Sequence, residues 1–548
     1  NVMLRIGRQK EFNYLYKLPK NHAPGTHWYH GHVHGSTALQ VQGGMAGALI
    51  VDPLDAQSSL NPPGYRVQEH IIVIRAESQD ELRPKAGAAA DLQTAAEAEL
   101  IDLKTPRELE ELVNRLTDHE LDQLVQSIHS LRVPNPLLTV NGQVQPVASV
   151  ANDEIQRLRL INAGSRKSDF RDLWIRDHDM YLAAFDGINL TRLTRSKGQF
   201  TRYNRDNPLQ LAPGNRADVF FIPKPGVTHS LMAAGRIQVE SFKPQPRTPS
   251  AVGPGEPRQR ARALVQELIS FSSPPRAGRV SGDSPLASTP FLEALDAHLQ
   301  GLQESLPAYR TGYLRPFTEE PSTTRSLTFN VTDRNMPKKR SFSINMRSFN
   351  PPPTQEIHGH HDMPGSSDYL GLKAGDGGQG PDGQSPWPPR AGTEEEWTVK
   401  NESGVRHPLH IHVSPFWITD IHENYCLDPK GQARPCDLSP KDIEYCRCND
   451  NETKEFGSVR KYSPHDPRLD RWQDTVTLPH KGSVTFRHRF SPGLTGLYVL
   501  HCHILQHEDR GMMMNILTVP HQHRSPGDFF KDQNRENERL NRAIASGT

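Results

Sequence analysis

The chain has 548 residues, with 64 Lys or Arg and 63 Asp or Glu, which gives a formal net charge of +1 at pH 7. This balance offers no basis for a nucleic-acid or acidic-membrane partner. No apolar run reaches the roughly 18 residues that a transmembrane helix needs. The length predicts three or four domains, and the 46 Pro and 40 Gly, many in turn-like clusters, predict an all-β protein.

The first region, residues 1–75, contains strand-like segments such as the buried-strand run AGALIVDP at 46–53. It is shorter than the roughly 100 residues of a complete β-sandwich, so we expect an incomplete first domain. Residues 76–134 differ, because TPRE at Thr105–Glu108 and TDHE at Thr117–Glu120 are capping boxes followed by apolar residues at helical spacing. We therefore expect a helical insertion with a packing role.

The strand pattern returns in residues 135–240, in segments such as PLLTVNGQ and LQLAPGNRADVFFIP. Residues 241–324 are rich in Pro, Arg and Ser, which is typical of a linker or a decorated connection. Within this connection we predict helices at 258–271 and 289–305.

A third β-rich region spans residues 325–522, and residues 523–548 form a polar, charged tail. Four of the five Cys lie in a polar, loop-like part of the third region. Disulfides formed in an oxidising compartment are the favoured interpretation. Free thiols are one alternative, and zinc binding is another, although the usual C-x-x-C pairs are missing. These residues are Cys426, Cys436, Cys446 and Cys448.

The stretch LYVLHCHILQHEDRGM at 497–512 concentrates metal-binding side chains: His501, Cys502, His503, His507 and Met512. Two imidazoles and a thiolate with a weak axial thioether are the ligand set of a blue-copper centre. Cys502, His507 and Met512 supply three of these four ligands. His501 and His503 exceed that need and flank the Cys on either side.

Three of the H-x-H pairs in the chain stand out, and the strand period explains their spacing. Residues i and i+2 point to the same face of a strand, so each pair can converge on one site. Ordinary surface or hydrogen-bonded His is the alternative for a single pair, and it is favoured for His27 and His34, but three pairs together indicate metal. The pairs are His30 and His32, His410 and His412, and His501 and His503.

The same alternation places Cys502 on the face opposite to His501 and His503. One strand then presents two imidazoles to one metal site and a thiolate to another, an arrangement that suits electron transfer between them. His407 lies three residues before His410, outside the pair. It can complete the blue-copper set of Cys502.

At these residues the sequence resembles the multicopper oxidase family, which includes laccases and bacterial cuprous oxidases. GTHWYHGHVHGSTALQVQGGMAGALIV is similar to the family's second copper motif, HPLHIHVSPFWI to its third and GLYVLHCHILQHEDRGMMMNI to its fourth. VNGQVQP, RLRLINA, FDG and LAPGNRADV resemble its second domain, which holds no copper. The resemblance implies tandem cupredoxin-like Greek-key β-sandwiches, three in number, the first of them incomplete here.

The resemblance also implies residue roles and a reaction. Electrons from a small-molecule or metal-ion donor would enter at type 1 copper and reduce O₂ to water at type 2 and type 3 copper, with up to four copper ions in a complete protein. The catalytic residues would be Cys502, His501, His503 and Glu508, the last as a proton relay. The implied ligands are His407, Cys502, His507 and Met512 for type 1, His410 for type 2, and His30, His32, His412, His501 and His503 for type 3.

One motif of the family has no counterpart in the sequence. An H-x-H-G motif should lie some tens of residues before His30, and nothing in 1–27 fits, since His22 lacks the motif. The chain also begins with Asn1 rather than Met. We therefore expect an N-terminally truncated piece of a periplasmic or extracellular protein, whose type 2 and type 3 sites lack two ligands within this chain.

Other classes of function would use a similar fold, and a structural protein that has lost copper is disfavoured by the intact Cys502 and its candidate ligands. A copper-binding or electron-transfer protein without O₂ reduction is the main alternative, because only the blue-copper set is complete. The H-C-H arrangement speaks against a copper nitrite reductase, whose chemistry needs one His beside the Cys. Scattered Met residues favour laccase-like oxidation of phenols or aromatic amines over Cu(I), and other metal ions stay open as donors.

Overall fold

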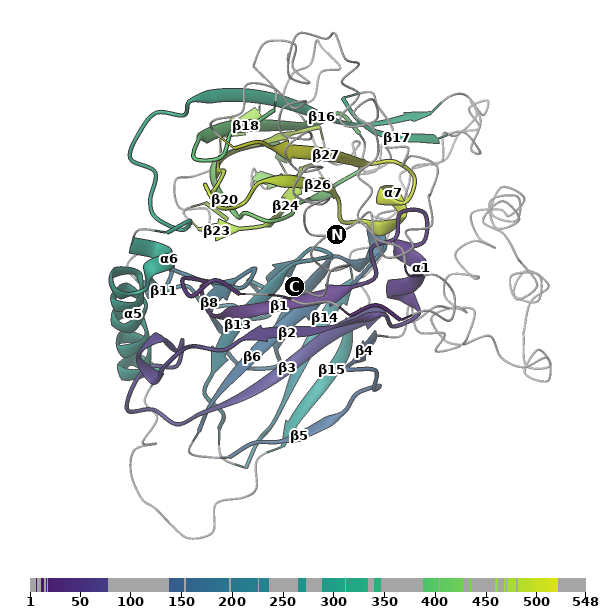
Figure 1. Ribbon diagram of the computed structural model, residues 1–548. Helices are drawn as coiled ribbons and strands as arrows, with labels where there is room; N and C mark the ends of the chain where they lie inside the picture. Colours follow the sequence, from purple (N-terminus) through teal and green to yellow (C-terminus); the bar gives the residue numbers. More distant parts are fainter. Residues whose placement is uncertain are drawn as a thin grey trace, which may run out of the picture.

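The computed structural model describes residues 18–76, 138–235, 265–272, 288–345, 388–435 and 459–520, with short gaps within these ranges, and a few positions before residue 18. Figure 1 shows two stacked β-structures, the upper one formed by the C-terminal strands and the lower one by the middle of the chain. The predicted all-β architecture is confirmed.

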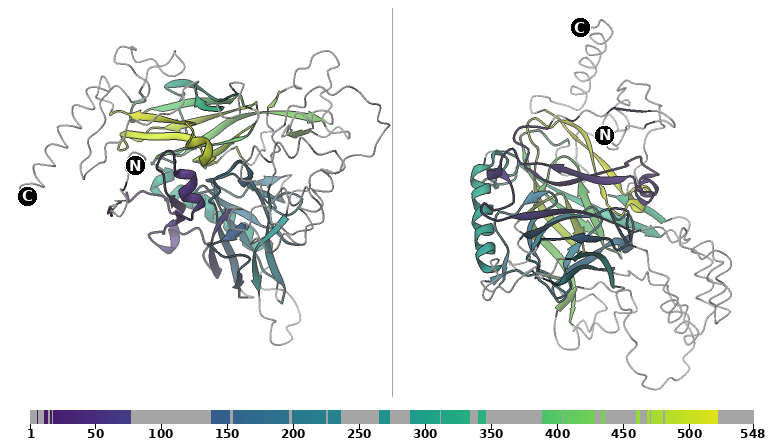
Figure 2. Two further views of the ribbon diagram at one scale, coloured as in Figure 1. Left: turned by 90° about the vertical axis from the view of Figure 1, so that its right-hand side faces the viewer. Right: turned by 90° about the horizontal axis from the view of Figure 1, so that it is seen from below.

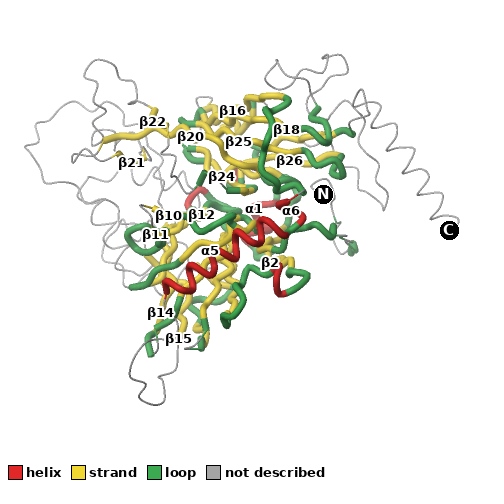
Figure 3. The backbone as a smooth tube through the Cα atoms, turned by 90° about the vertical axis from the view of Figure 1, so that its left-hand side faces the viewer, coloured by secondary structure: helices red, strands yellow, loops and turns green. Residues whose placement is uncertain are grey.

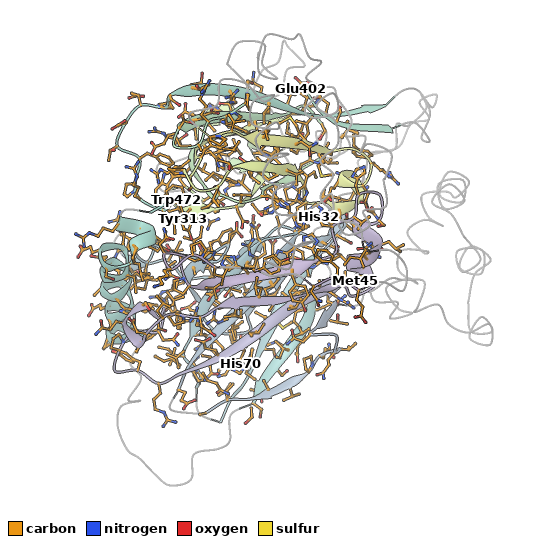
Figure 4. All side chains as sticks on the ribbon, in the orientation of Figure 1. His32, Met45, His70, Tyr313, Glu402 and Trp472 are labelled. Carbon is orange, nitrogen blue, oxygen red and sulfur yellow. The ribbon has the colours of Figure 1, made fainter. Side chains whose placement is uncertain are left out.

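The earliest elements form a small antiparallel sheet beside the junction of the two halves. β1 (Gly25–His30) pairs with β2 (Ala46–Val51), so that His30 lies opposite Ala46. The short helix α1 (Thr37–Gln42) lies between them in sequence, and a 3-10 turn follows at Ala56–Ser58. The loop before α1 carries His32, which Figure 4 places between the two halves.

A middle sandwich is built from two facing sheets that enclose one apolar core. Its six-stranded sheet has the order β4-β3-β6-β13-β8-β9, and its five-stranded sheet has the order β12-β7-β14-β15-β5. The bounds are β3 Val67–Ala76, β4 Leu138–Val140, β5 Val147–Ser149, β6 Ile155–Asn162, β7 Arg171–Ile175, β8 Tyr181–Phe185, β9 Ile188–Asn189, β12 Leu209–Leu211, β13 Arg216–Phe221, β14 Thr228–Gly235 and β15 Val265–Ser272. A 3-10 turn spans Lys167–Asp169, and β10 (Arg195–Ser196) pairs with β11 (Gln199–Phe200).

The six-stranded sheet is covered on both faces. In β13, Val219 and Phe221 face the core of the sandwich, and Phe220 faces the helix α5 (Ser288–Ser305), followed by α6 (Pro307–Arg310). Such two-sided burial explains why Val219, Phe220 and Phe221 are three consecutive apolar residues. Figures 2 and 3 show α5 lying along one side of the lower half. The helix predicted at 289–305 is confirmed as α5.

The upper sandwich has an eight-stranded and a four-stranded sheet around a second core. Phe170 and Ala212 of the middle sandwich belong to this core cluster, so the two halves share packing. The larger sheet holds β17 Arg340–Ile344, β16 Thr323–Asp333, β18 Glu394–Asn401, β25 Ser483–Arg489, β20 Phe416–Leu427, β21 Ala433–Pro435, β22 Val459–Lys461 and β23 Trp472–Gln473. The smaller holds β24 Thr475–Leu478, β19 His407–Ile411, β26 Gly496–Cys502 and β27 Met513–Thr518, and α7 (Leu505–Glu508) follows β26.

The helix predicted at 258–271 is wrong, because Val265–Ser272 form β15 between β14 and β5. A register shift beside Leu268 lets the adjacent Leu268 and Ile269 both be buried, which breaks the strand alternation and imitates a helical pattern. The sheet pairing also differs from the predicted domain division, since β3 pairs with β6 and β15 with β14. Both strands therefore belong to the middle sandwich rather than to the first region or the connection.

Several predictions fall on residues that the structure does not describe. These are the helices of the 76–134 insertion, the tail at 523–548 and the disulfides, since no side chain of Cys426, Cys436, Cys446 or Cys448 is described. Among the described residues, no helix has both the length and the apolar character needed to cross a membrane.

Candidate metal centres

The first candidate centre is the buried group of His407, Cys502 and His507. His407 Nδ1 lies 3.3 Å from Cys502 Sγ, His507 Nδ1 lies 3.7 Å from the same sulfur, and the two Nδ1 atoms are 3.2 Å apart. His407 opens β19 and Cys502 closes β26, and these strands pair at Leu409 and Cys502. The strand pairing therefore brings residues 95 positions apart into ligand range.

Met512 closes the loop that carries this group. It is fully buried, its carbonyl accepts a hydrogen bond from the Cys502 amide at 3.0 Å, and its own amide donates to the His507 carbonyl at 3.0 Å. Gly511, in the left-handed region with φ of 106°, allows the chain to turn back toward Cys502. The loop thus holds the thioether residue in the same core as the thiol and the two imidazoles.

The hydrogen bonds of His407 fix which ring nitrogen faces the sulfur. Ser403 Oγ lies 2.7 Å from His407 Nε2, and the Ser403 hydroxyl can give its own hydrogen to Asn401 Oδ1 at 2.8 Å. With the Ser403 hydroxyl donating to Asn401, His407 Nε2–H donates to Ser403, and the Nδ1 lone pair is directed at Cys502. The ring of His507 stacks on Phe342, with centroids 4.4 Å apart.

The electrostatics of this group favour a bound cation. Burial lowers the pKa of His407 to about 3 and raises the pKa of the Cys502 thiol, so both are uncharged without a cation. The two Nδ1 atoms lie 3.2 Å apart, close enough for one cation to be bound by both. Thiol, thioether and imidazole donors are those that copper prefers, and a bound cation deprotonates the thiol. The donor set therefore fits copper.

The second candidate centre is a cluster of six imidazoles at the junction of the halves. His32 Nε2 and His412 Nε2 lie 3.3 Å and 3.2 Å from His501 Nε2. His30, His410 and His503 adjoin these rings, with centroid separations between 4.9 and 5.6 Å. The loop after β1 supplies His32, β19 and its end supply His410 and His412, and β26 and its end supply His501 and His503.

Glu508 orients the rings of the second cluster. Its Oε2 lies 3.0 Å from His501 Nδ1 and its Oε1 lies 3.4 Å from His32 Nδ1, and the carboxylate is fully buried. Burial raises the pKa of Glu508, but the charges of His501 and His32 outweigh it and lower that pKa to about 2. The Nδ1 atoms of both rings thus face acceptor oxygens, which for His501 include the Cys502 carbonyl at 3.2 Å, and the Nε2 atoms face one another.

Strand β26 joins the two centres. His501 and His503 belong to the imidazole cluster, and Cys502 between them belongs to the first centre. All nine residues that sequence reasoning proposed as His or Cys ligands lie in one group or the other. His27 lies apart, with its ring against Gly187 of the middle sandwich.

Sequence reasoning missed the residues that hold the ligands. Asp509 accepts hydrogen bonds from the amides of Gly35, Thr37 and Ala38, and so fixes the start of α1 beside the His32 loop. Ser403 and Asp474 act through His407 and His410. No spacing rule links these residues to the ligands.

Comparisons with known proteins agree with the geometry. Two multicopper oxidase family models match residues 5–56 and 336–522. The chain is 33% identical over 135 residues to the laccase of Bacillus subtilis, covering 24% of this chain and 22% of that protein. It is 20% identical over 520 residues to rice "Multicopper oxidase LPR1 homolog 5", covering 92% of this chain and 62% of the relative's length.

Solved structures similar to the chain are multicopper oxidases too. McoA from Aquifex aeolicus is similar with a TM-score of 0.48 and 16% identity, covering 90% of this chain and 76% of that one. The Campylobacter jejuni protein described as a metallo-oxidase has a TM-score of 0.46, 16% identity and coverage of 92% and 73%. Two matching family models, together with the copper-fitting donor set, lead to one conclusion: the chain belongs to the multicopper oxidase family.

Proposed function

We propose that the protein is a copper-dependent oxidase that takes single electrons from a donor near His507 and uses them to reduce O₂ at the imidazole cluster. Copper at the two centres would supply the one-electron redox chemistry and the binding of O₂. The observation that carries the proposal is β26, because adjacent residues of one strand belong to both centres.

The residues have separate roles in the reaction O₂ + 4 e⁻ + 4 H⁺ → 2 H₂O. His407, Cys502 and His507, with Met512, form the electron-accepting site, and Cys502 passes electrons along the backbone to His501 and His503. Glu508 holds His501 and His32 in place and is the carboxylate that can hand a proton to the cluster. The Thr37 hydroxyl, 3.3 Å from Glu508 Oε1, is the next group through which a proton can reach it.

The donor would approach the first centre at His507. His507 is 8% exposed, whereas His407, Cys502 and Met512 are fully buried. Phe342 is 4% exposed and stacks on the His507 ring, so it fixes that ring and leaves its exposed edge to the donor. Phenols and aromatic amines are the first donor class. Metal ions are the second donor class, and the chemistry together with the Cys-rich segment suits a periplasmic or extracellular location.

Oxygen uptake by the copper-loaded chain tests the proposal. With a phenol or a ferrous salt as donor, we expect one O₂ to be consumed for every four electrons removed, with water as the product. Electron transfer without O₂ reduction would instead give a visible copper–thiolate band that the donor bleaches and O₂ does not restore. Hydrogen peroxide as the main product would also contradict the proposal.

A further inference from the structure

Arg216, at the start of β13 in the middle sandwich, lies 3% exposed at the junction with the upper sandwich. A guanidinium has five N–H donors, and each one here has an acceptor. The acceptors are the Thr26 carbonyl for Nε (3.4 Å), the Gly214 carbonyl and Asp474 Oδ1 for Nη1 (3.0 and 2.8 Å), and the Asp186 carbonyl and Asp474 Oδ2 for Nη2 (2.9 and 2.6 Å).

These acceptors belong to segments that carry or touch different imidazoles of the cluster. Thr26 lies in β1, which ends at His30. Gly214 packs against His503 so closely that a Cβ atom at this position would lie 2.7 Å from the ring. Asp474 directly precedes β24, which pairs with β19 so that Thr475 lies opposite His410. One side chain therefore fixes three segments relative to each other.

The connection from Asp474 to His410 also fixes the tautomer of His410. Thr475 Oγ1 donates its one hydrogen to Asp474 Oδ1 at 2.8 Å, so it can only accept from His410 Nδ1, 2.9 Å away. The Asp474 carbonyl, 3.0 Å from the same nitrogen, is an acceptor only. His410 Nδ1 must therefore carry the hydrogen, which leaves the Nε2 lone pair free for a ligand.

Asp186 supports the same peptide from the middle sandwich. Its Oδ2 accepts the amides of Asp474 and Thr475 at 3.2 and 3.0 Å, and its Oδ1 accepts the Arg216 amide at 3.0 Å. Asp186 is 1% exposed, so these contacts are shielded from water. Asp186 thus binds the backbone amides of residues 474 and 475, and Arg216 binds the side chain of Asp474.

We propose that Arg216 is a positioning residue for the oxygen-reducing site, and that with Asp186 it sets the orientation of His410 and the place of His503. Among the described residues, the middle sandwich holds no group of metal-binding side chains of its own. Its role is thus to act as a template for a metal site made of residues from its neighbours. The identity of the metal rests on the proposed function, but the orientation of His410 does not.

The first test measures the His410 tautomer in the copper-free chain. Nitrogen NMR of ¹⁵N-histidine-labelled protein reports which ring nitrogen carries the hydrogen, and His410→Asn assigns the signal. We expect a pure Nδ1–H tautomer in the wild type and a mixture in Arg216→Lys, because an ammonium offers three donors in place of the fork. The matched control is Arg157→Lys, since Arg157 is equally buried but bonds to Asn61, Glu69 and Asp218.

The second test measures copper binding to the same proteins. Arg216→Lys should keep the copper–thiolate band of the Cys502 centre and bind copper at the imidazole cluster on the order of 10- to 100-fold more weakly. Arg157→Lys should change neither. Electron paramagnetic resonance and copper content separate the two centres.

The outcomes remain distinct from those of the proposed function. A wild-type chain that binds copper only at Cys502 would contradict oxygen reduction by this chain, and the tautomer measurement would still decide the role of Arg216. An unchanged His410 signal in folded Arg216→Lys would overturn the positioning role. If Arg216→Lys does not fold, Asp186→Asn is measured instead, because Asn keeps the shape of Asp but places an amide against the 474–475 peptide. An unchanged His410 signal in Asp186→Asn would also overturn the positioning role.

Discussion

The two candidate centres differ in how they are built. The Cys502 centre draws its residues from one part of the chain, between His407 and Met512, and lies within one apolar core. The imidazole cluster draws on the loop after β1, on β19 and on β26, and rests on Gly214 and Arg216 of the middle sandwich. A centre inside a single core depends on that core alone, whereas a centre at a junction depends on every segment that meets there.

The largest expected effect is that of Cys502→Ser. The variant removes the thiolate ligand and the direct step to His501 and His503, so the copper–thiolate band should vanish and donor-driven O₂ uptake should fall to background. The imidazole cluster should still bind copper, because none of its side chains changes. Loss of copper from both centres in a folded variant would show that they are not separate in the way the structure indicates.

Glu508→Gln should slow the reaction while leaving the first centre intact. The amide keeps the size of the buried side chain but cannot pass a proton, so we expect turnover to fall about 10²- to 10⁴-fold. The copper–thiolate band should not change. Glu402→Gln is the control, because Glu402 lies in the upper sandwich far from the cluster (Figure 4) and bonds to Asn330. Equal turnover of Glu508→Gln and wild type would remove Glu508 from the proton path.

Gly214→Ala tests how far the imidazole cluster depends on its contact with the middle sandwich. The new Cβ would press on the His503 ring, and φ at this position is +89°, so we expect a loss of about 1–3 kcal/mol in unfolding free energy and weaker copper binding at the cluster. Gly226→Ala is a matched control, since its φ is +70° but nothing lies within 4 Å of its Cβ. If both variants bind copper alike, contact with Gly214 does not set the place of His503.

The smallest effect concerns acid stability inside the upper core. His488 is fully buried beside Trp397 and Phe490. The residue opposite it in the sheet is Glu395, which bonds to Arg325. Burial lowers the pKa of His488 from 6.5 to about 3. The unfolded chain binds the proton more readily, so stability falls as the pH drops from 6.5 toward 3, by about 1.4 kcal/mol per unit.

His488→Phe should remove this contribution. Its unfolding free energy should fall about 2 kcal/mol less than that of the wild type between about pH 7.5 and pH 5. Denaturant titrations at the two pH values measure the difference, and any change in packing cancels because it is present at both. Parallel pH profiles would show that His488 is not kept neutral in the fold.

The ligands could be predicted from the sequence because their pattern is local. Residues i and i+2 of a strand share a face, so HCH at 501–503 already separates Cys502 from His501 and His503. Arg216, Asp186 and Gly214 could not be identified as supports, since their partners lie far away in the chain and follow no spacing rule. The helix prediction at 258–271 failed because of the bulge at Leu268 in β15. The assignment of β3 to the middle sandwich could not be predicted either, because it depends on the parallel pairing of β3 with β6.

Reoxidation by O₂ tests the central claim most directly, namely that β26 couples an electron-accepting centre to an oxygen-reducing one. The copper-loaded chain is reduced without oxygen until its copper–thiolate band is bleached, and O₂ is then admitted in a stopped-flow instrument. The account predicts that the band returns as O₂ is consumed, with four electrons used per O₂ and no peroxide released. A band that stays bleached in the presence of O₂ would contradict it.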